Sequence, residues 1–329
     1  MAVKVFAYSL RDFDEREIFF KTAEKYSIEV GYSREKPMPE NAHLAKGYDC
    51  ISVLTTPVRG ELMREFHKNG VKMISARTIG YDHIDIALAK ELGISVSNVS
   101  YSTESVADFT VMLMLMALKN AKRMIQRADI NDFTLRGLIG RELHDMTVGI
   151  IGTGSIGRVV MRDLQGFGCK ILCCDHHVRE EAARMGEYVS FERLLRESDI
   201  ISLHVPLKHG AGYLLSQAEF AKMKRGAIIV NTARGGLIDS GALIAALESG
   251  HIAAAALDVV EDEFGIYYYD RKADCIGNHS LAVLRDMPNT IITPHMAFYT
   301  RDAVRDMVEN SLLSCKWEME GSPNKFKIV

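Results

Sequence analysis

The chain has 329 residues, with 40 Lys and Arg against 43 Asp and Glu, so its formal charge is −3 at pH 7. Hydrophobic residues make up 47% and charged residues 25%, a composition typical of globular domains that excludes a disordered chain, a collagen-like repeat and a coiled coil. At about 150 residues per domain, this length favours two domains. The near-balance of charge offers no basic field for phosphates, so we expect no nucleic-acid partner.

Neither a membrane span nor a metal site is predicted. The longest apolar run, residues 111–118, is far shorter than the roughly 18 to 20 residues that cross a bilayer, and the first residues are typical of a strand rather than a targeting segment. Cys169, Cys173 and Cys174 cluster beside an apolar run without the spacing of a metal motif, so we expect buried thiols. We therefore expect a cytoplasmic protein with no membrane partner and no bound metal.

Short apolar runs alternate with helical stretches along nearly the whole chain, which favours parallel sheets covered by helices. In the first third, strands are predicted at residues 3–9, 28–33, 50–56, 72–78 and 94–99. Helices are predicted between them, for example at residues 61–69 and at residues 85–92, where Gly93 is a plausible C-cap. The alternation begins again at Met146, with strands predicted at residues 147–152, 170–175, 200–205, 227–232, 254–259 and 289–294. Two successive sets predict two α/β domains.

Two helical segments bear on how these domains are joined. Residues 105–118 are apolar on more than one face, so we expect this helix to link the domains or to pack against another subunit. A long C-terminal helix is predicted by apolar residues at helical spacing after the last strand: Val304, Met307, Val308, Leu312 and Cys315. If this helix returns to the first domain, that domain is discontinuous.

The segment Gly152 to Gly157, GTGSIG, has the G-x-G-x-x-G spacing between a predicted strand and a predicted helix, which is the pattern of a dinucleotide-binding turn. Gly152 permits the tight turn, Gly154 lets the backbone approach a pyrophosphate, and Gly157 allows close helix packing. The pyrophosphate is expected at the helix N-terminus, where N–H groups and the helix dipole favour an anion.

Asp175 ends the next predicted strand, 18 residues beyond Gly157, where a carboxylate can accept hydrogen bonds from the adenosine ribose hydroxyls. It would also repel a 2′-phosphate, and no arginine follows directly, so NAD is favoured over NADP as the cofactor. His176 and His177 come next and could interact with a phosphate if protonated, which keeps NADP as an alternative.

Three further polar segments follow predicted strands. Arg234 lies in NTARGG, Glu263 lies in an acidic run, and His295 follows the last strand. The carboxyl ends of parallel strands line the crevice in which such sheets bind ligands, and an arginine there can bind a carboxylate through both arms of its guanidinium. Taken singly, each also has a plain structural explanation: a surface arginine, an acidic loop or a solvated histidine.

Five motifs occur together in one order: GTGSIG (152–157), HVP (204–206), NTARGGLID (231–239), ALDVVEDE (256–263) and TPHMAFYT (293–300). In this combination the sequence resembles the D-isomer-specific 2-hydroxyacid dehydrogenases over essentially its whole length. It is most similar to their D-lactate dehydrogenase branch, which the loop FGIYYYD after Glu263 also resembles, and to the vancomycin-resistance D-lactate dehydrogenases. The resemblance implies two Rossmann-like or flavodoxin-like parallel-sheet α/β domains with the active site in the cleft between them. It implies a discontinuous substrate domain, residues 1–101 plus 299–329, and an NAD-binding Rossmann domain, residues 102–298.

The resemblance also implies roles for the site residues. His295 would be the general acid that protonates the 2-oxo group as hydride arrives from NADH, and Glu263 would orient its imidazole. Arg234 would bind the substrate carboxylate and polarise the 2-oxo group, with the backbone N–H groups of Ile79 and Gly80 completing the grip. Around NAD, the family pattern places Gly152, Gly154, Ser155, Ile156, Gly157, Asp175, Val205, Pro206, Thr232, Ala233, Arg234 and Asp258. Around the substrate, it places Leu54, Ile79, Gly80, Tyr101, Arg234, His295 and Phe298.

These features predict NAD-dependent reduction of pyruvate, or a similar small 2-oxo acid, to the D-2-hydroxy acid. Several members of the branch have a tyrosine at the position of Leu54, so a preference for a bulkier acid such as 2-oxoisocaproate or phenylpyruvate is the alternative. The alternative from another class is an NADH-sensing corepressor, because such proteins resemble this family and retain the Arg, Glu and His. We further expect a homodimer.

Overall fold

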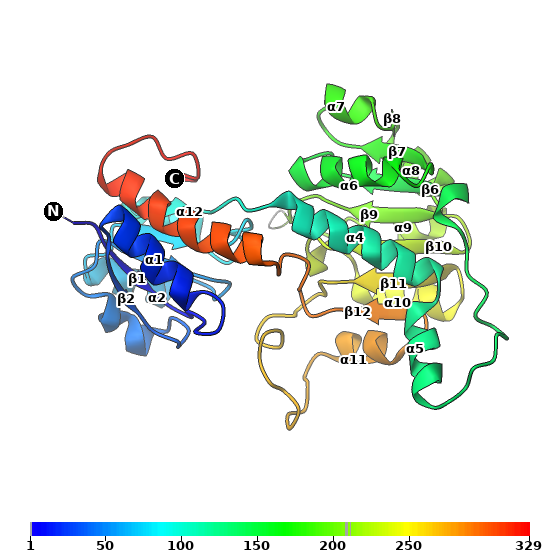
Figure 1. The fold of residues 1–329 in the computed structure, drawn as a ribbon, viewed down its shortest axis with the longest axis horizontal. Helices are drawn as coiled ribbons and strands as arrows, with labels where there is room; N and C mark the ends of the chain where they lie inside the picture. The colour runs from blue at the N-terminus through cyan, green and yellow to red at the C-terminus, as the bar shows by residue number, and fades with distance from the viewer. Residues whose placement is uncertain (1, 208–209, 211) are drawn as a thin grey trace. The chain divides into compact units, whose positions relative to one another are not determined.

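The computed structural model describes residues 2–207, 210 and 212–329. The chain forms two compact units, unit 1 (Met1–Ser102 and Tyr299–Val329) and unit 2 (Thr103–Phe298). Each unit contains one parallel sheet with helices on both faces (Figure 1). The predicted fold class of two parallel-sheet α/β domains is therefore confirmed. No helix within the described ranges is long and apolar enough to cross a membrane.

Unit 1 contains a five-stranded sheet with the strand order β2-β1-β3-β4-β5, the order of flavodoxin-like folds. The strands are β1 (Lys4–Ala7), β2 (Glu29–Tyr32), β3 (Cys50–Val53), β4 (Met73–Ala76) and β5 (Ser95–Ser97). One face packs against η1 (Pro39–Ala45), α2 (Gly60–Lys68) and α3 (Ile86–Leu92), and the other against α1 (Arg16–Tyr26) and α12 (Arg301–Met319). The C-terminal helix α12 thus completes unit 1 although it follows unit 2 in the sequence.

Unit 2 contains a seven-stranded sheet with the strand order β12-β11-β10-β9-β6-β7-β8. This is a doubly wound sheet in which the order reverses between β6 and β9. The strands are β6 (Thr147–Ile151), β7 (Lys170–Cys174), β8 (Glu187–Tyr188), β9 (Ile200–Leu203), β10 (Ala227–Asn231), β11 (Ile252–Leu257) and β12 (Thr290–Ile292). The two-residue strand β8 was not predicted, because two residues are too few to produce a periodic pattern.

Helices cover both faces of the unit 2 sheet, and each face has its own apolar core. One core is formed with α4 (Thr103–Leu118) and α6 (Ser155–Gln165), and the other with α8 (Phe191–Glu197), α9 (Gln217–Lys222), α10 (Ser240–Glu248) and α11 (His279–Asp286). The remaining helical segments are α5 (Ala121–Asp129), η2 (Leu143–Asp145), α7 (Glu180–Ala183) and η3 (Gly235–Leu237).

Helix α4 includes the apolar segment 105–118. Nine of its 16 residues are buried, and it packs against α6, β10 and β11 of its own unit. Burial inside unit 2 therefore accounts for part of the apolar character of this segment. The expectation that this helix links the domains or packs against another subunit stays a prediction, because Met112 on the same helix is 39% exposed.

The three clustered cysteines lie on or beside β7. Cys173 is buried, Cys169 and Cys174 are partly buried, and all three are free thiols whose pKa is raised by burial. Among the described residues, no group of three potential ligands could hold a metal ion.

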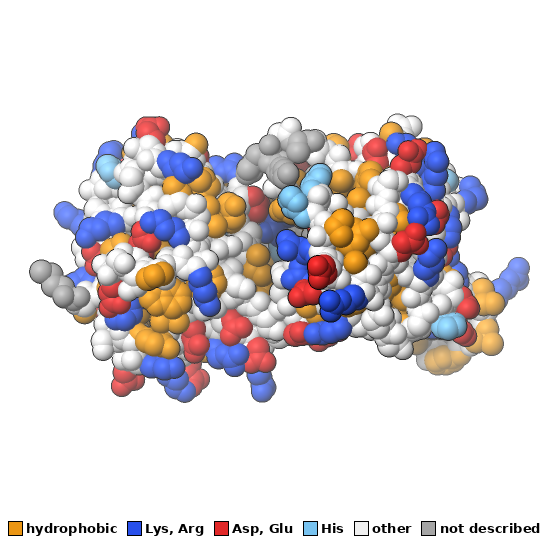
Figure 2. Space-filling view, turned by 90° about the horizontal axis from the view of Figure 1, so that it is seen from above, with side chains coloured by type: hydrophobic (Ala, Val, Ile, Leu, Met, Phe, Trp, Pro, Cys, Tyr) orange, Lys and Arg blue, Asp and Glu red, His pale blue; other side chains and the backbone are white. Residues whose placement is uncertain are grey.

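Figure 2 shows basic and acidic side chains interspersed over the face in view, without a field of one sign.

Unit 1 contains a fully buried ion pair between Arg77 and Glu15. Neither side chain is exposed, and Arg77 Nε lies 3.3 Å from Glu15 Oε1. The guanidinium also donates hydrogen bonds to the carbonyl oxygens of Ser52 and Tyr8, at 3.1 and 2.9 Å. Burial lowers the pKa of Arg77 while Glu15 acts in the opposite direction. Because Arg77 directly follows β4, this pair ties the loop after β4 to the loop after β1.

Removing the Glu15 carboxylate should therefore leave a buried, unpaired cation. We expect Glu15→Ala to lower the free energy of unfolding of unit 1 by about 3–5 kcal/mol. Urea unfolding followed by tryptophan fluorescence would measure this, because the chain has one tryptophan, Trp317, and it lies in α12 of unit 1.

The matched control is Glu29→Ala, which removes an exposed carboxylate 3.0 Å from Lys4 Nζ. An exposed pair of this kind contributes about 1 kcal/mol or less. Equal losses in the two variants would contradict a special role for the buried pair.

Candidate active site

The predicted site residues of unit 2 follow the carboxyl ends of its strands. The glycine loop follows β6, Asp175 follows β7, Val205 and Pro206 follow β9, Arg234 follows β10, and Asp258 and His295 follow β11 and β12. Because the strands are parallel, these ends lie along one edge of the sheet.

The glycine loop fits a bound pyrophosphate. Gly152 has a φ of +97°, and a Cβ there would clash with the carbonyl oxygen of His204. A Cβ on Gly157 would clash with the carbonyl oxygen of Gly152, so both positions need glycine for packing. By contrast, a Cβ on Gly154 would meet no described atom within 4 Å, so the backbone here faces open space at the start of α6. Ser155 and Ile156 form the first turn of α6, whose N–H groups suit an anion.

Asp175 holds the glycine loop in addition to its predicted role. Its Oδ2 accepts hydrogen bonds from Thr153 N at 2.7 Å and Thr153 Oγ1 at 3.0 Å, and its Oδ1 accepts one from His177 N at 3.3 Å. Burial acts to raise the pKa of Asp175, but these hydrogen bonds outweigh it and lower the pKa overall. The carboxylate therefore stays ionised, as both ribose binding and repulsion of a 2′-phosphate require.

The segment after β9 packs against the glycine loop. His204 contributes its carbonyl oxygen beside Gly152, and Val205 contributes its side chain there. The His204 imidazole lies 2.9 Å from Ser202 Oγ, and burial lowers its pKa to about 4. This histidine is therefore neutral at pH 7. Pro206 is exposed at the end of the segment.

The loop that carries Arg234 is held by Asn231, a residue that sequence analysis did not single out. The fully buried Asn231 amide accepts a hydrogen bond from Ala233 N at 3.0 Å and donates one to the Arg234 carbonyl oxygen at 2.9 Å. Thr232 Oγ1 lies 2.8 Å from Thr110 Oγ1 on α4. The next residue, Gly235, passes so close to the Val260 backbone that a Cβ would clash. These contacts fix the backbone from which the Arg234 side chain extends.

His295 and Glu263 form the hydrogen bond that was expected from the family pattern. His295 Nδ1 lies 2.6 Å from Glu263 Oε1, and Glu263 Oε2 accepts a hydrogen bond from Val260 N at 2.9 Å. Both side chains are about one-fifth exposed, at 23% and 22%. With Nδ1 bound to the carboxylate, Nε2 is the ring nitrogen that can exchange a proton with a ligand.

Asp258 binds the His295 loop rather than reaching the surface. The side chain is fully buried, and its carboxylate accepts hydrogen bonds from Thr293 Oγ1 at 2.6 Å, Met296 N at 2.8 Å and Ala297 N at 2.9 Å. The Asp258 carbonyl oxygen accepts a fourth, from His295 N at 2.8 Å. Burial raises its pKa, and the hydrogen bonds offset part of that effect. Asp258 therefore positions the loop of His295.

Tyr268 is a second residue that sequence analysis missed. Its hydroxyl donates a hydrogen bond to the His295 carbonyl oxygen at 2.9 Å, and its ring centroid lies 6.1 Å from that of His295 and 6.4 Å from that of Phe298. Both Tyr268 and His295 have positive φ values, +71° and +55°. A left-handed conformation is rare for such side chains and is often found at functional sites. The run of three tyrosines after Glu263 was the available signal.

The remaining predicted substrate residues belong to unit 1, where they follow strand ends as well. Leu54 follows β3, Ile79 and Gly80 lie in the loop after β4, and Tyr101 lies beyond β5. The Ile79 carbonyl oxygen accepts a hydrogen bond from Asn98 Nδ2 at 2.7 Å, and the Gly80 carbonyl oxygen accepts one from Thr78 Oγ1 at 2.7 Å. The loop that carries the two predicted N–H donors is thus held in one conformation.

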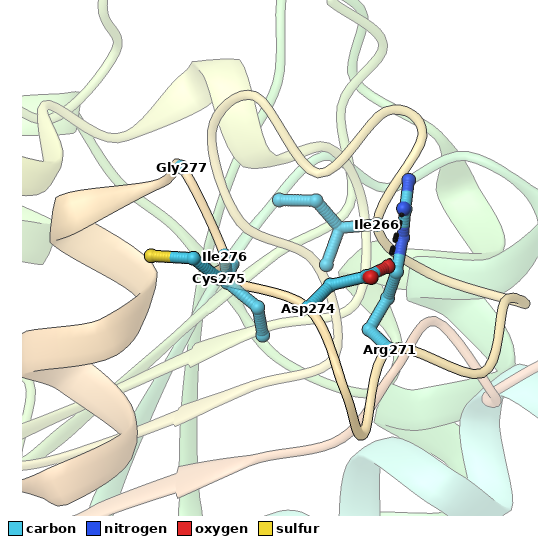
Figure 3. A pocket seen from close by; sticks show the side chains of 6 residues that line it. All are labelled: Ile266, Arg271, Asp274, Cys275, Ile276 and Gly277. Atoms are coloured by element: carbon cyan, nitrogen blue, oxygen red, sulfur yellow. Dashed lines mark hydrogen bonds and ion pairs between the residues drawn. The ribbon is translucent and has the colours of Figure 1, made fainter.

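A small hollow lies in the loop after Glu263 and is lined by none of the predicted site residues (Figure 3). It is lined by Ile266, Arg271, Asp274, Cys275, Ile276 and Gly277. Arg271 Nη1 lies 2.8 Å from Asp274 Oδ2, and in Figure 3 the two side chains point toward one another. Since this arginine is already paired with a carboxylate, we do not place a substrate there.

The chain is similar to known proteins over nearly its whole length. The model of the D-isomer specific 2-hydroxyacid dehydrogenase NAD-binding domain matches residues 111–297. A D-specific alpha-keto acid dehydrogenase of Enterococcus faecium is 42% identical, over 92% of this chain and 93% of that protein. An aromatic 2-oxoacid reductase of Clostridium sporogenes is 41% identical, over 97% of this chain and 98% of that protein. The structure of a Treponema pallidum D-lactate dehydrogenase has a TM-score of 0.88 at 32% identity and covers 99% of this chain and 100% of its own.

These matches favour an enzyme over the NADH-sensing corepressor. The matched family model describes an NAD-binding domain, and the glycine loop and the ionised Asp175 fit that cofactor. The chain therefore belongs to the D-isomer-specific 2-hydroxyacid dehydrogenase family, in its D-lactate dehydrogenase branch, and is an NAD-dependent enzyme.

Proposed function

We propose that the enzyme reduces pyruvate, or a similar small 2-oxo acid, to the D-2-hydroxy acid, with His295 as the general acid. The observation that carries this proposal is the 2.6 Å contact between His295 Nδ1 and Glu263 Oε1, because it leaves Nε2 as the proton donor. Bound NADH supplies the hydride that adds to C2 of the substrate. His295 Nε2–H gives its proton to the 2-oxo oxygen, so the carbonyl becomes a secondary alcohol, and solvent returns a proton to the imidazole.

The proposed role of Arg234 is to bind the substrate carboxylate. Its planar guanidinium can bind both carboxylate oxygens, and its positive charge also stabilises the negative charge that develops on the 2-oxo oxygen. The Asn231 hydrogen bonds support this role, because they hold the backbone of the arginine loop in place. The N–H groups of Ile79 and Gly80 are assigned to the same carboxylate, and Leu54, Tyr101 and Phe298 to the side chain of the substrate.

The substitution His295→Gln tests the proton donor. A glutamine can still donate a hydrogen bond but cannot deliver a proton, so we expect kcat with pyruvate to fall by about 100-fold or more while NADH binding stays nearly unchanged. NADH oxidation measured by absorbance, with chiral analysis of the product, gives both turnover and stereochemistry. Unchanged turnover would contradict the role of His295, and an L-product from the parent enzyme would contradict the proposed reaction.

A preference for a bulkier 2-oxo acid is the second candidate, and the aromatic side chains beside His295 favour it. Tyr268 and Phe298 are edge-to-face, and Tyr268 is 51% exposed. Rings arranged in this way suit a substrate with an aromatic side chain. A contact between that ring and a protein ring is more favourable than the burial of its apolar area alone. The relative from Clostridium sporogenes, which is named for aromatic 2-oxo acids, gives the same suggestion.

The substitution Tyr268→Ala distinguishes the two candidates. If the ring contacts the substrate side chain, kcat/KM should fall about tenfold more for phenylpyruvate than for pyruvate. Tyr269→Ala is the matched control, because that neighbouring ring is 53% exposed and lies against Arg271 instead. Equal losses with both acids would mean that Tyr268 acts through the His295 loop and not on substrate choice.

We also propose that the enzyme is a homodimer and works in the cytoplasm. The dimer is supported by an apolar arm on α5 and the loop after it, where five large side chains are 57–92% exposed: Ile125, Ile130, Phe133, Leu135 and Ile139. Exposed apolar groups at this density are typical of an association surface.

The cytoplasmic location is supported by the six cysteines, all of which lie in the described ranges and are free thiols.

A charge placed in this arm should dissociate the dimer. We expect the parent to behave as a dimer of 36.7-kDa chains in light scattering and Phe133→Asp to behave as a monomer, because dimerisation would bury the charge. Phe13→Asp is the control, since Phe13 is equally exposed, at 79% against 76%, but lies in unit 1. A monomeric parent, or dissociation by both variants, would contradict the assignment of the arm.

A further inference from the structure

Tyr188 lies in a chain of hydrogen bonds that ends at Asp175. It is the second residue of the short strand β8, which pairs with β7 at the edge of the unit 2 sheet. Its hydroxyl oxygen lies 2.7 Å from Thr153 Oγ1 and 3.1 Å from Arg179 N. Thr153 in turn contacts Asp175 Oδ2 through both its backbone N–H and its hydroxyl, at 2.7 and 3.0 Å. These hydrogen bonds thus connect β8, the loop before α7 and the glycine loop.

The direction of every hydrogen bond in this chain follows from its ends. An ionised carboxylate only accepts, so the single proton of the Thr153 hydroxyl points to Asp175. Thr153 Oγ1 must then accept the proton of the Tyr188 hydroxyl. At the other end, the N–H group of Arg179 only donates, so Tyr188 accepts there. All donors therefore point the same way, and hydrogen bonds aligned in this manner polarise and strengthen one another.

This series of hydrogen bonds places the two carboxylate oxygens of Asp175 in different environments. Oδ2 is committed to Thr153, a residue with no exposed surface, whereas Oδ1 accepts the longer hydrogen bond from His177 N at 3.3 Å. A carboxylate whose one oxygen is fixed to a buried loop cannot rotate freely, so the direction in which Oδ1 faces is set by Thr153. Thr153 is itself held by Tyr188.

From this arrangement we infer that Tyr188 is a positioning residue, which acts through Thr153 to hold the Asp175 carboxylate toward the adenosine ribose hydroxyls and so contributes to the selection of NADH over NADPH. The inference rests on the proposed placement of the cofactor ribose at Asp175. It concerns the binding of the cofactor and not the chemical step, because Tyr188 belongs to the edge strand β8 and His295 follows β12 at the opposite end of the sheet.

The substitution Tyr188→Phe tests the role directly, since it removes the hydroxyl and keeps the ring. Fluorescence titration of the full-length protein with NADH and with NADPH measures binding independently of turnover. Loss of one hydrogen bond in the chain should raise the Kd for NADH roughly three- to tenfold, with a smaller change for NADPH. Because the chemical step is not involved, kcat at saturating NADH should remain close to that of the parent.

Three further variants separate positioning from a general loss of stability. Tyr269→Phe removes a hydroxyl from an exposed tyrosine that is not in the chain and should change neither Kd. Thr153→Ser retains the hydroxyl and should bind NADH nearly as the parent does, whereas Thr153→Val should weaken it. Combining Thr153→Val with Tyr188→Phe should add little to Thr153→Val alone, because either change breaks the same chain.

Two results would overturn the inference. One is a Kd for NADH in Tyr188→Phe equal to that in Tyr269→Phe. The other is an equal rise in the Kd for NADH and NADPH together with a lower melting temperature, which would assign Tyr188 a structural role in the sheet edge. Failure of the proposed reaction would look different: the parent would bind NADH but reduce no 2-oxo acid, and the binding constants of the variants would still decide the role of Tyr188.

Discussion

All strands of the unit 2 sheet run in the same direction, and the position of each functional loop depends on this constraint. Parallel strands end at one edge of their sheet, so residues far apart in the chain can meet there. Glu263 and His295 are separated by 32 positions, yet their side chains lie 2.6 Å apart. At the reversal of strand order between β6 and β9, the same constraint places the glycine loop against His204.

Buried polar side chains then fix the conformation of these loops. Asp258 and Asn231 have no exposed surface, and each binds the backbone of a loop that carries a proposed catalytic side chain. Such contacts can maintain a left-handed conformation at His295, which an unsupported loop would tend to avoid. In unit 1 the buried Arg77 has the same function, because it follows a central strand and binds the backbone of neighbouring loops.

Much of the fold could be predicted because its signals are local. The segment 147–152 is a short apolar run that ends in a glycine turn, and an adjacent helical pattern completes the unit, so its strand and helix were both identified. Arg234, Glu263 and His295 could be named because their motifs occur in one order along the chain. Strand β8 was harder to predict, because it is too short to produce a periodic pattern. The packing partners of helix α4 were also harder to predict, because a helix that is apolar on more than one face has the same pattern whichever neighbour covers it.

The sequence by itself determined the two α/β domains and the NAD motif and pointed to Arg234, Glu263 and His295 as candidate catalytic side chains, because periodicity, glycine spacing and motif order are all present along the chain. Only the tertiary structure decided that Asp258 binds the His295 loop and that Tyr268 contacts His295. It also decided that Tyr188 meets Thr153, which lies 35 positions away. The physical reason is that a hydrogen bond between distant residues depends on how strands and loops are stacked in space, and such a contact produces no periodic pattern in either segment.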